Sequence, residues 1–532
     1  MTRRLSNPGA GRRGMRVALL AAALALAGCT SLIPRYERPE PPVAATYTAD
    51  LLPGGAGTTA AADIPWQTFF GDARLRTLIQ VALDNNRDLR ASALAIERAR
   101  ALYNVQRASG FPTVGVGVGG QLQPNPKELG GGTSQLYTAG LAVPSWEIDF
   151  FGRIRSLSEA ALAQFLATEE ARRAAQISLI AAVANTYFAA LADDELLAVT
   201  EQTLATREET LRLTRLRFDV GASSEFELRQ AESLLESARA TLAQQVRQRA
   251  LDENALVLLL GQPVPADLPP GLRLADQQLV TDLPAGLPSE LLTRRPDIRQ
   301  AEQLLLSANA NIGAARAAFF PSISLTGSVG VASTRLGSLF TNGTFAWSVA
   351  PQMLLPIFDA GRNRANLAVA EADRDLALAR YERSIQTAFR EVSDALAGRA
   401  TLTEQVRALN AQSNAEAVRF RLADLRYRSG ASSFLDVLDA QRALFQVQQA
   451  ALQVRAAQVQ NLVTLYQVLG GGWTDPASAP PADAAAGSAG GTPAAAPTSA
   501  TATPKPVPMP GALPPGTETR LPSNPVPPAP AR

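Results

Sequence analysis

Short sequence matches recur along the 532-residue chain at one constant spacing. A Gly-Arg-x-Arg stretch that begins at residue 152 returns at residue 361, and 361 − 152 = 209. The matching stretches are residues 111–112 and 320–321, 152–155 and 361–364, 221–224 and 430–433, and 260–261 and 469–470. Four matches at one offset, without insertion or deletion, indicate two copies of one structural unit. Each copy is predicted to run helix, two strands, very long helix, helix.

Each copy contains two runs in which apolar residues alternate with small or polar ones. This period of two predicts strands with one apolar face. The apolar positions are Val114, Val116, Val118, Tyr137, Ala139, Leu141, Val143, Ile323, Leu325, Val329, Val331, Phe345, Trp347, Val349 and Met353. The edge of a soluble sandwich would alternate in the same way. The runs are nevertheless about as long as transmembrane barrel strands and carry aromatic residues near their ends, which favours a membrane barrel.

A helical stretch without proline follows each strand pair, at about residues 153–220 and 362–429. Each would span about 100 Å at 1.5 Å per residue. Apolar residues in the first stretch step by three and four, which is coiled-coil spacing; they are Ile177, Ile180, Ala184, Tyr187 and Leu191. Gly221 and Gly430 are predicted to end the two long helices, after which a second helix returns.

Four strands per chain are too few to close a membrane barrel, because single-chain barrels begin at about eight. An open sheet edge cannot face lipid, where its backbone groups would lack partners. Several chains must therefore share one barrel. A dimer would supply eight strands, which side chains fill, whereas a trimer would supply twelve and leave a pore. The predicted fold is an α+β membrane protein, a trimeric 12-stranded β-barrel continued by a long α-helical periplasmic barrel.

The N-terminus carries a targeting signal. Basic residues precede an apolar run at residues 17–27, which is too short to span a bilayer; they are Arg3, Arg4, Arg12, Arg13 and Arg16. The run ends in Leu-Ala-Gly-Cys at residues 26–29, which resembles a bacterial lipobox. The resemblance implies cleavage before Cys29 and acylation of its sulfur and its new amino group. Thr30, rather than Asp, follows and implies delivery to the outer membrane. The alternative is a buried cysteine after an ordinary signal peptide.

Composition divides the remainder of the chain. We expect a signal peptide at 1–28, a lipidated extended tether at 29–65, repeat 1 at 66–261, an irregular equatorial segment at 262–288, repeat 2 at 289–472 and a disordered Pro/Ala-rich tail at 473–532. Residues 72–108 show one continuous helical pattern that Gly110 and Pro112 end.

Several functional classes are disfavoured. The formal charge is +2, so no basic surface argues for nucleic acid. The chain has no histidine and one cysteine, and it lacks nucleotide-binding and nucleophile motifs. We therefore expect no enzyme activity, no cofactor and no metal, although an enzyme that uses carboxylates alone stays open.

Four runs resemble the TolC-like outer-membrane efflux channels, within their NodT-type lipoprotein branch that OprM exemplifies. They are residues 66–72, 294–302, 314–323 and 438–442, and the resemblance covers about residues 30–472. It implies a homotrimer in outer-membrane lipid that meets a periplasmic adaptor (membrane fusion) protein and an inner-membrane pump, expected to be proton-driven. The channel would passively conduct drugs or other small solutes. A helical structural lipoprotein without a pore and a duct for protein secretion are the alternatives.

The resemblance also implies a gate. In this branch a Leu and an Asp, one turn apart on the last inner helix, constrict the periplasmic end, and Leu435 and Asp439 match these positions. Spacing i, i+4 places both side chains on one helix face. Threefold symmetry would make a Leu ring that opposes wetting and an Asp ring that attracts cations. Gln230 stands 209 residues before Asp439, so the predicted gate is threefold within a pseudo-sixfold tube. Alternatively, Asp439 caps its helix or pairs with Arg442.

The turns between the long helices are implied to meet the adaptor. The residues concerned are Gly221, Ala222, Ser223, Gly430, Ala431 and Ser432. They can equally be plain turns between antiparallel helices. Both interpretations can hold, because glycine permits the turn and exposes the backbone to a partner.

Overall fold

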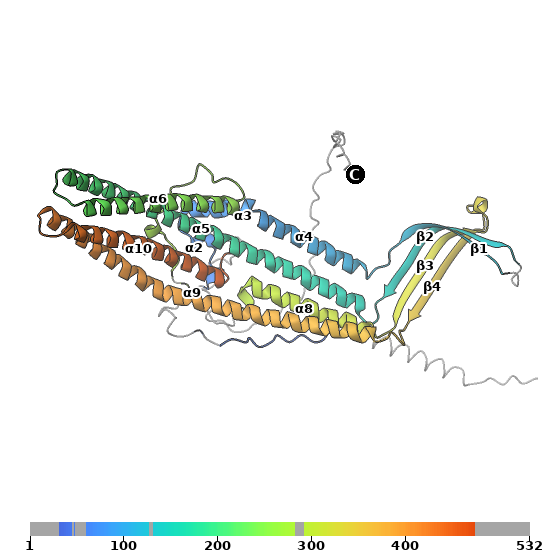
Figure 1. The fold of residues 1–532 in the computed structure, drawn as a ribbon. Coiled ribbons are helices and arrows are strands. Elements are labelled where there is room, and N and C mark those ends of the chain that lie inside the picture. The colour runs from blue at the N-terminus through green and yellow to red at the C-terminus, as the bar shows by residue number, and fades with distance from the viewer. Residues whose placement is uncertain are drawn as a thin grey trace, which may run out of the picture. The chain divides into compact units, whose positions relative to one another are not determined.

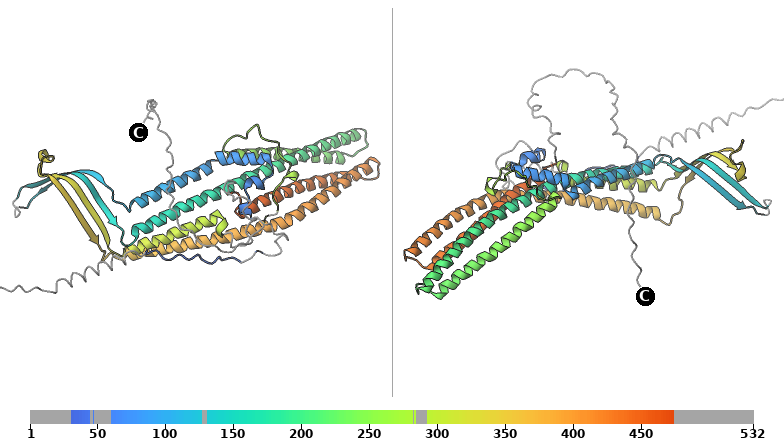
Figure 2. Two further views of the ribbon diagram at one scale, coloured as in Figure 1. Left: turned by 180° about the vertical axis from the view of Figure 1, so that it is seen from behind. Right: turned by 90° about the horizontal axis from the view of Figure 1, so that it is seen from above.

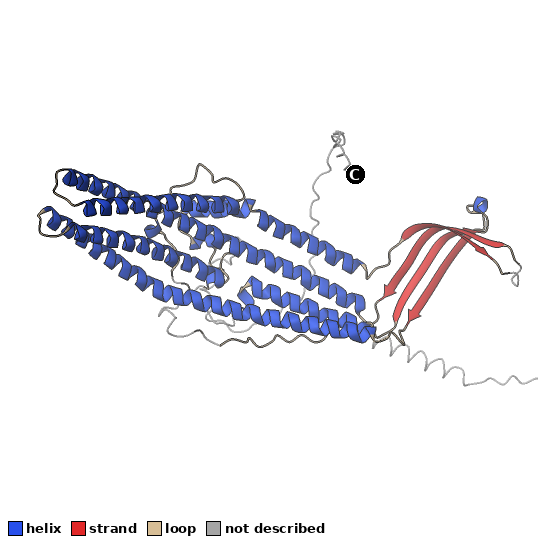
Figure 3. Ribbon diagram, viewed as in Figure 1, coloured by secondary structure: helices blue, strands red, loops and turns tan. Residues whose placement is uncertain are grey.

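The computed structural model describes residues 31–44, 47, 60–126, 131–281, 283 and 292–473. The predictions for the signal peptide, for Cys29 and for the segment from residue 474 onward lie outside these residues. The strands and the long helices occupy separate regions (Figure 3). The elements are η2 Ala61–Asp63, α2 Trp66–Phe69, α3 Ala73–Asn85, α4 Arg87–Ala108, β1 Gly115–Pro124, β2 Thr133–Ile148, α5 Arg153–Asp219, α6 Glu225–Leu260, η4 Leu274–Asp276, α8 Pro296–Ala317, β3 Ser322–Ser333, η5 Leu336–Ser338, β4 Phe345–Leu354, α9 Arg362–Arg428 and α10 Phe434–Val468.

The helices recur at the spacing found in the sequence. Helices α5 and α9 each have 67 residues, and 362 − 153 = 209. Helices α4 and α8 each have 22 residues, and 296 − 87 = 209. The starts of α6 and α10 differ by 434 − 225 = 209. The offset therefore applies to whole helices and not only to the matched stretches.

The four strands form one antiparallel sheet in the order β1-β2-β3-β4. Cross-strand partners share a face, and neighbouring rows differ in character. One row holds Val116, Leu141, Val329 and Trp347, and the next holds Gly117, Gly140, Gly330 and Ala346. The large apolar side chains are exposed, with Val116 at 81% and Trp347 at 69%. The sheet thus has one apolar face and one face of small residues, and β1 and β4 are its two edges.

Two hairpins of long helices extend away from the sheet, α5 with α6 and α9 with α10 (Figures 1 and 2). Helix α8 packs between α5 and α9 near the sheet, and α4 packs on α5. Within the described residues, α5 is the one helix long and apolar enough to cross a membrane by length and composition. Many of its apolar side chains, between Leu179 and Ala192, belong to the buried core, so its composition reflects helix packing instead.

The main core includes residues of the short elements α2 and α3 together with residues of the long helices. The ring of Phe69 stacks on that of Tyr466, with centroids 4.0 Å apart. Asp72 is buried and caps α3 by accepting a hydrogen bond from the backbone N–H of Arg74. Its other oxygen accepts the hydroxyl of Tyr187 at 2.8 Å. The run 66–72 therefore ties the start of repeat 1 to helices α5 and α10.

The prediction of one continuous helix at 72–108 is wrong. Asn86 separates α3 from α4, and its backbone is extended. Its side-chain oxygen accepts the N–H of Leu89, while its amide donates to the carbonyl of Leu259. Asparagine at a helix N-cap replaces a missing intrahelical bond, so the chain can turn here without leaving that donor unpaired. The contact with α6 is tertiary, and helical periodicity alone could not indicate it.

Residues 31–44, which we call the N-terminal segment, are extended and lie along α8. The buried carboxylate of Glu302 accepts hydrogen bonds from the Tyr36 hydroxyl and from two nitrogens of Arg38. The amide of Asn309 donates to the carbonyl of Pro34. A Cβ at Gly313 would lie 2.5 Å from a side-chain carbon of Ile33. Helix α8 therefore carries side chains that fit this segment.

Candidate functional site: the hairpin ends

Both long helices end in the same backbone motif. Gly221 has φ = 72° and Gly430 has φ = 76°, in the left-handed region that glycine adopts readily. The N–H of Ala222 donates to the carbonyl of Arg217, and the N–H of Ala431 donates to that of Arg426. These are Schellman bonds, which satisfy the last free carbonyls of each helix. The glycine stops predicted from the sequence are confirmed in position and conformation.

The two hairpin ends touch one another. The guanidinium of Arg217 on α5 donates to the hydroxyl of Tyr427 on α9, and its Cζ lies 5.0 Å from the centroid of that ring. A small apolar cluster lies beneath this contact and comprises Ala231, Phe434 and Leu438. It is separate from the main core, so the contact between the hairpin ends is small.

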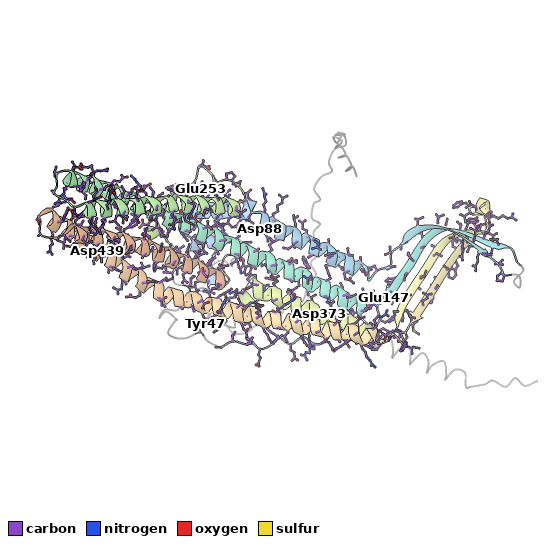
Figure 4. All side chains as sticks on the ribbon, in the orientation of Figure 1. Tyr47, Asp88, Glu147, Glu253, Asp373 and Asp439 are labelled. Carbon is purple, nitrogen blue, oxygen red and sulfur yellow. The ribbon has the colours of Figure 1, made fainter. Side chains whose placement is uncertain are left out.

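Leu435 and Asp439 are both exposed and lie one turn apart on α10. Figure 4 labels Asp439, which lies near the hairpin end. Leu435 is 52% exposed and the Asp439 side chain is 56% exposed. The opposite face of this helix is buried through Phe434, Val437 and Leu438. An exposed leucine beside a packed face is available to a neighbour outside the chain. The i, i+4 geometry expected for the pair is thus present.

Asp436 and Asp439 differ in role although they are one turn apart. Asp436 forms a capping box with Ser433 at the start of α10, so its carboxylate serves the helix terminus. Asp439 forms an ion pair with Arg419 of α9. Arg442, the partner considered from the sequence, forms no ion pair in the part of the chain that the structure describes. Its guanidinium instead lies near Arg207.

Arg207 is a buried cation that the sequence did not single out. One of its nitrogens donates to the carbonyl of Leu234 at 2.7 Å, and its Cζ lies 5.3 Å from the centroid of the Phe445 ring. Burial, and then the nearby charge of Arg442, lower its pKa. Arg207 therefore connects α5 with α6 and α10, across the two hairpins.

Arg419 is a second residue that the sequence did not single out. A usable signal was present, because residues at similar distances from the turn lie close to each other in a helical hairpin. Arg419 lies 430 − 419 = 11 residues before Gly430, and Asp439 lies 439 − 430 = 9 residues after it. Counting outward from Gly430 would have suggested this pair. Across the described ranges, no group of three acidic, histidine or cysteine side chains could hold a metal ion.

The comparisons with known proteins agree with this geometry. The profile of the outer membrane efflux protein family matches residues 78–262 and again 287–471. The two matches are offset by 287 − 78 = 209 and 471 − 262 = 209 residues. The chain belongs to this family. Family membership identifies a channel protein of the outer membrane rather than an enzyme, with the helical part in the periplasm, as the sequence predicted.

Relatives and solved structures extend the match over most of the chain. The antibiotic efflux pump outer membrane protein ArpC and the toluene efflux pump outer membrane protein TtgC, both of Pseudomonas putida, are each 47% identical over 463 residues. That alignment covers 86% of this chain and 95% of each relative. The open-state MtrE outer membrane channel of Neisseria gonorrhoeae is 43% identical, with a TM-score of 0.77, covering 84% of this chain and 99% of MtrE.

Proposed function

We propose that three copies of this chain form one channel through which a tripartite efflux system expels small molecules. The observation that carries the proposal is the four-stranded sheet, which has an exposed apolar face and two unpaired edges. Such edges cannot lie in lipid unless another chain pairs with them. Pairing β4 of one copy with β1 of the next closes a barrel of twelve strands, which leaves a lumen.

The lumen of this barrel would be lined by the small-residue face of the sheet. Register partners on that face include Gly117, Gly140, Gly330 and Ala346, and a further row holds Gly115, Ala142, Ser328 and Ser348. Small side chains keep the pore wide and give it little chemical selectivity. The choice of substrate would then be made by the pump. Antibiotics and toluene, the solutes in the names of two relatives, are compatible with such an unselective lining.

We place the gate at Leu435 and Asp439. Each is exposed on α10 in the single chain, and three copies would bring three leucines and three carboxylates around one axis. A ring of leucine side chains disfavours water, and a ring of carboxylates attracts cations and repels anions. The duct would then be constricted at its periplasmic end and open toward the barrel.

The remaining parts of the assembly meet at defined surfaces. The turns at Gly221–Ser223 and Gly430–Ser432 would contact a periplasmic adaptor, because their backbones are exposed at the hairpin ends. The adaptor would connect the channel to an inner-membrane pump, expected to be proton-driven. Acylated Cys29 would anchor each chain in outer-membrane lipid, since several acyl chains together bind a bilayer firmly.

The deciding experiment is conductance of the purified full-length protein in planar lipid bilayers. We expect discrete single-channel steps, with cations conducted in preference to anions. A deletion strain should also become more susceptible to drugs or solvents, and the chain supplied on a plasmid should restore resistance. An absence of conductance would favour a helical structural lipoprotein. Loss of a secreted protein from the medium, with unchanged drug susceptibility, would favour a secretion duct.

A further inference from the structure

Three charged side chains connect α9 and α10 beside the proposed gate. One nitrogen of Arg419, Nη1, lies 3.1 Å from Oε2 of Glu416 one turn earlier on α9. The other, Nη2, donates to Oδ2 of Asp439 on α10. A single guanidinium thus holds two carboxylates at once, one from its own helix and one from the facing helix.

Repeat 1 links its two helices at another place, where Arg239 of α6 contacts Glu236 of its own helix and Glu208 of α5. It has no such link at the positions equivalent to the proposed gate. The equivalent positions are 416 − 209 = 207, 419 − 209 = 210 and 439 − 209 = 230. They hold Arg207, Thr210 and Gln230, so both carboxylates and the arginine between them are replaced. A charged link that includes the proposed gate position is therefore present in repeat 2 and absent at the equivalent positions of repeat 1.

We propose that Arg419 is a positioning residue for the gate: it turns the Asp439 carboxylate toward α9 and offsets its charge. The inference rests on the gate proposed above. An unpaired Asp439 would be free to extend toward the channel axis, where three negative charges would strengthen cation selectivity and repel one another. With Arg419 in place, the constriction carries less charge, and its side chains have fewer conformations.

The link is suited to adjustment rather than to permanent closure. Both side chains are about half exposed, at 49% for Arg419 and 56% for Asp439. Exposed ion pairs contribute little to stability and are screened by salt. A cationic solute can therefore take the place of the guanidinium beside Asp439 without unfolding the hairpin. A shift of α10 against α9 can likewise separate the two side chains. Arg419 then sets the charge that a solute meets at the constriction.

The test is reversal potential and conductance of the full-length channel in planar bilayers under a KCl gradient. Arg419→Ala should shift the reversal potential toward ideal cation selectivity and raise conductance several-fold at low salt. The difference should shrink in about 1 M KCl, where charges are screened within about 3 Å. Arg419→Lys keeps the positive charge and should stay near the unmodified channel. Asp439→Asn added to Arg419→Ala should abolish the shift, because both changes act through one pair.

The matched control is Arg407→Ala, which removes an exposed arginine of α9 that is paired with Glu404 one turn earlier. It has the same change in net charge and should leave the reversal potential unchanged. Two outcomes separate the proposals. If Leu435→Ala with Asp439→Ala opens the channel but Arg419→Ala does not move the reversal potential, the gate stands and the role of Arg419 is refuted. If neither variant alters the channel, the gate itself is misplaced and this inference falls with it.

Discussion

Helices α4 and α8 occupy equivalent positions in the two repeats and have equal length, but their surroundings differ. Leu89 is the buried residue of α4, whereas nine residues of α8 are buried. Helix α8 is covered by α5, by α9 and by the N-terminal segment, while α4 packs on α5. Apolar side chains on α4, such as Val105 at 68% exposure, are left for a neighbouring chain in the proposed trimer. The two repeats thus have equivalent helices, but different segments pack against those helices.

The hairpin ends show the same contrast in charge. Repeat 2 carries Glu416, Arg419 and Asp439 as a linked group, whereas the equivalent positions of repeat 1 hold the buried Arg207, Thr210 and Gln230. A ring built from repeat 2 alone repeats three times around the proposed channel, although the helices repeat six times. The functional asymmetry of the tube is therefore expected to lie in a few side chains rather than in its backbone.

The largest expected effect is on single-channel conductance, when the proposed gate residues of repeat 2 and the equivalent residues of repeat 1 are substituted in separate variants. Leu435→Ala with Asp439→Ala should raise single-channel conductance several-fold, because it removes both proposed rings. The equivalent residues of repeat 1 are 435 − 209 = 226 and 439 − 209 = 230. Phe226→Ala with Gln230→Ala should change conductance much less. Equal effects from the two double variants, measured in planar bilayers, would mean that the constriction is not confined to repeat 2.

The next largest effect is expected on stability, when the N-terminal segment is displaced from α8. Gly313→Leu should displace the N-terminal segment, since even a Cβ there would meet Ile33 and Ser156. We expect destabilisation by about 1–3 kcal/mol and faster hydrogen exchange in residues 31–38. Asn104→Leu is the matched change in α4, because 313 − 209 = 104, and this position is exposed. Similar exchange in both variants would show that Gly313 does not hold the segment.

A third prediction uses a carboxyl pair that only repeat 1 has. Asp193 of α5 hydrogen bonds to Asp252 of α6, and two carboxyl groups can do so only if one is protonated. Burial, then this hydrogen bond, then the charges of Asp252 and Asp194 raise the pKa of Asp193 to about 7. Oδ2 of Asp252 is buried and has no other donor among the residues described. The equivalent positions of repeat 2 hold Leu402 and Asn461.

The direction of the pH effect follows from this raised pKa. Unfolded aspartate titrates near about 4, so the folded chain holds the extra proton between about pH 4 and 7. The stability contributed is complete below about pH 4 and is lost as pH rises through about 7. We expect the melting temperature at pH 8.5 to lie about 3 °C below that at pH 5.5. Asp252→Asn should remove most of this difference, while Glu253→Gln, an exposed neighbour, should retain it.

The smallest effect on stability is expected at the turns, where the two repeats are alike. A Cβ at Gly221 or Gly430 would meet nothing within 4 Å, so the cost of a substitution comes from positive φ alone. Gly221→Asp and Gly430→Asp should each cost about 1 kcal/mol and leave the fold intact. Efflux and crosslinking to the adaptor should nevertheless fall in the double variant. Unchanged efflux would remove the proposed adaptor contact from these turns.

Much of the fold could be predicted because its determinants are local and periodic. Alternation at 345–353 predicted β4, and the absence of proline predicted two helices at about 153–220 and 362–429. In the structure each ends one residue earlier, at Asp219 and Arg428. The stops at Gly221 and Gly430 followed from the conformation that glycine permits. The period of the apolar residues and the positions of glycine and proline determine these elements independently of what the elements pack against.

The contacts between distant residues were decided by tertiary structure alone. Asn86 divides a continuous helical pattern because α6 offers a carbonyl to its amide. Glu302 is buried because Tyr36 and Arg38 reach it from 264 or more positions earlier in the chain. Asp439 pairs with Arg419 on the facing helix rather than with Arg442 on its own. The sequence determined which elements form and that they recur, since backbone propensity and apolar period are local; which charges meet depended on how helices far apart in the chain pack together.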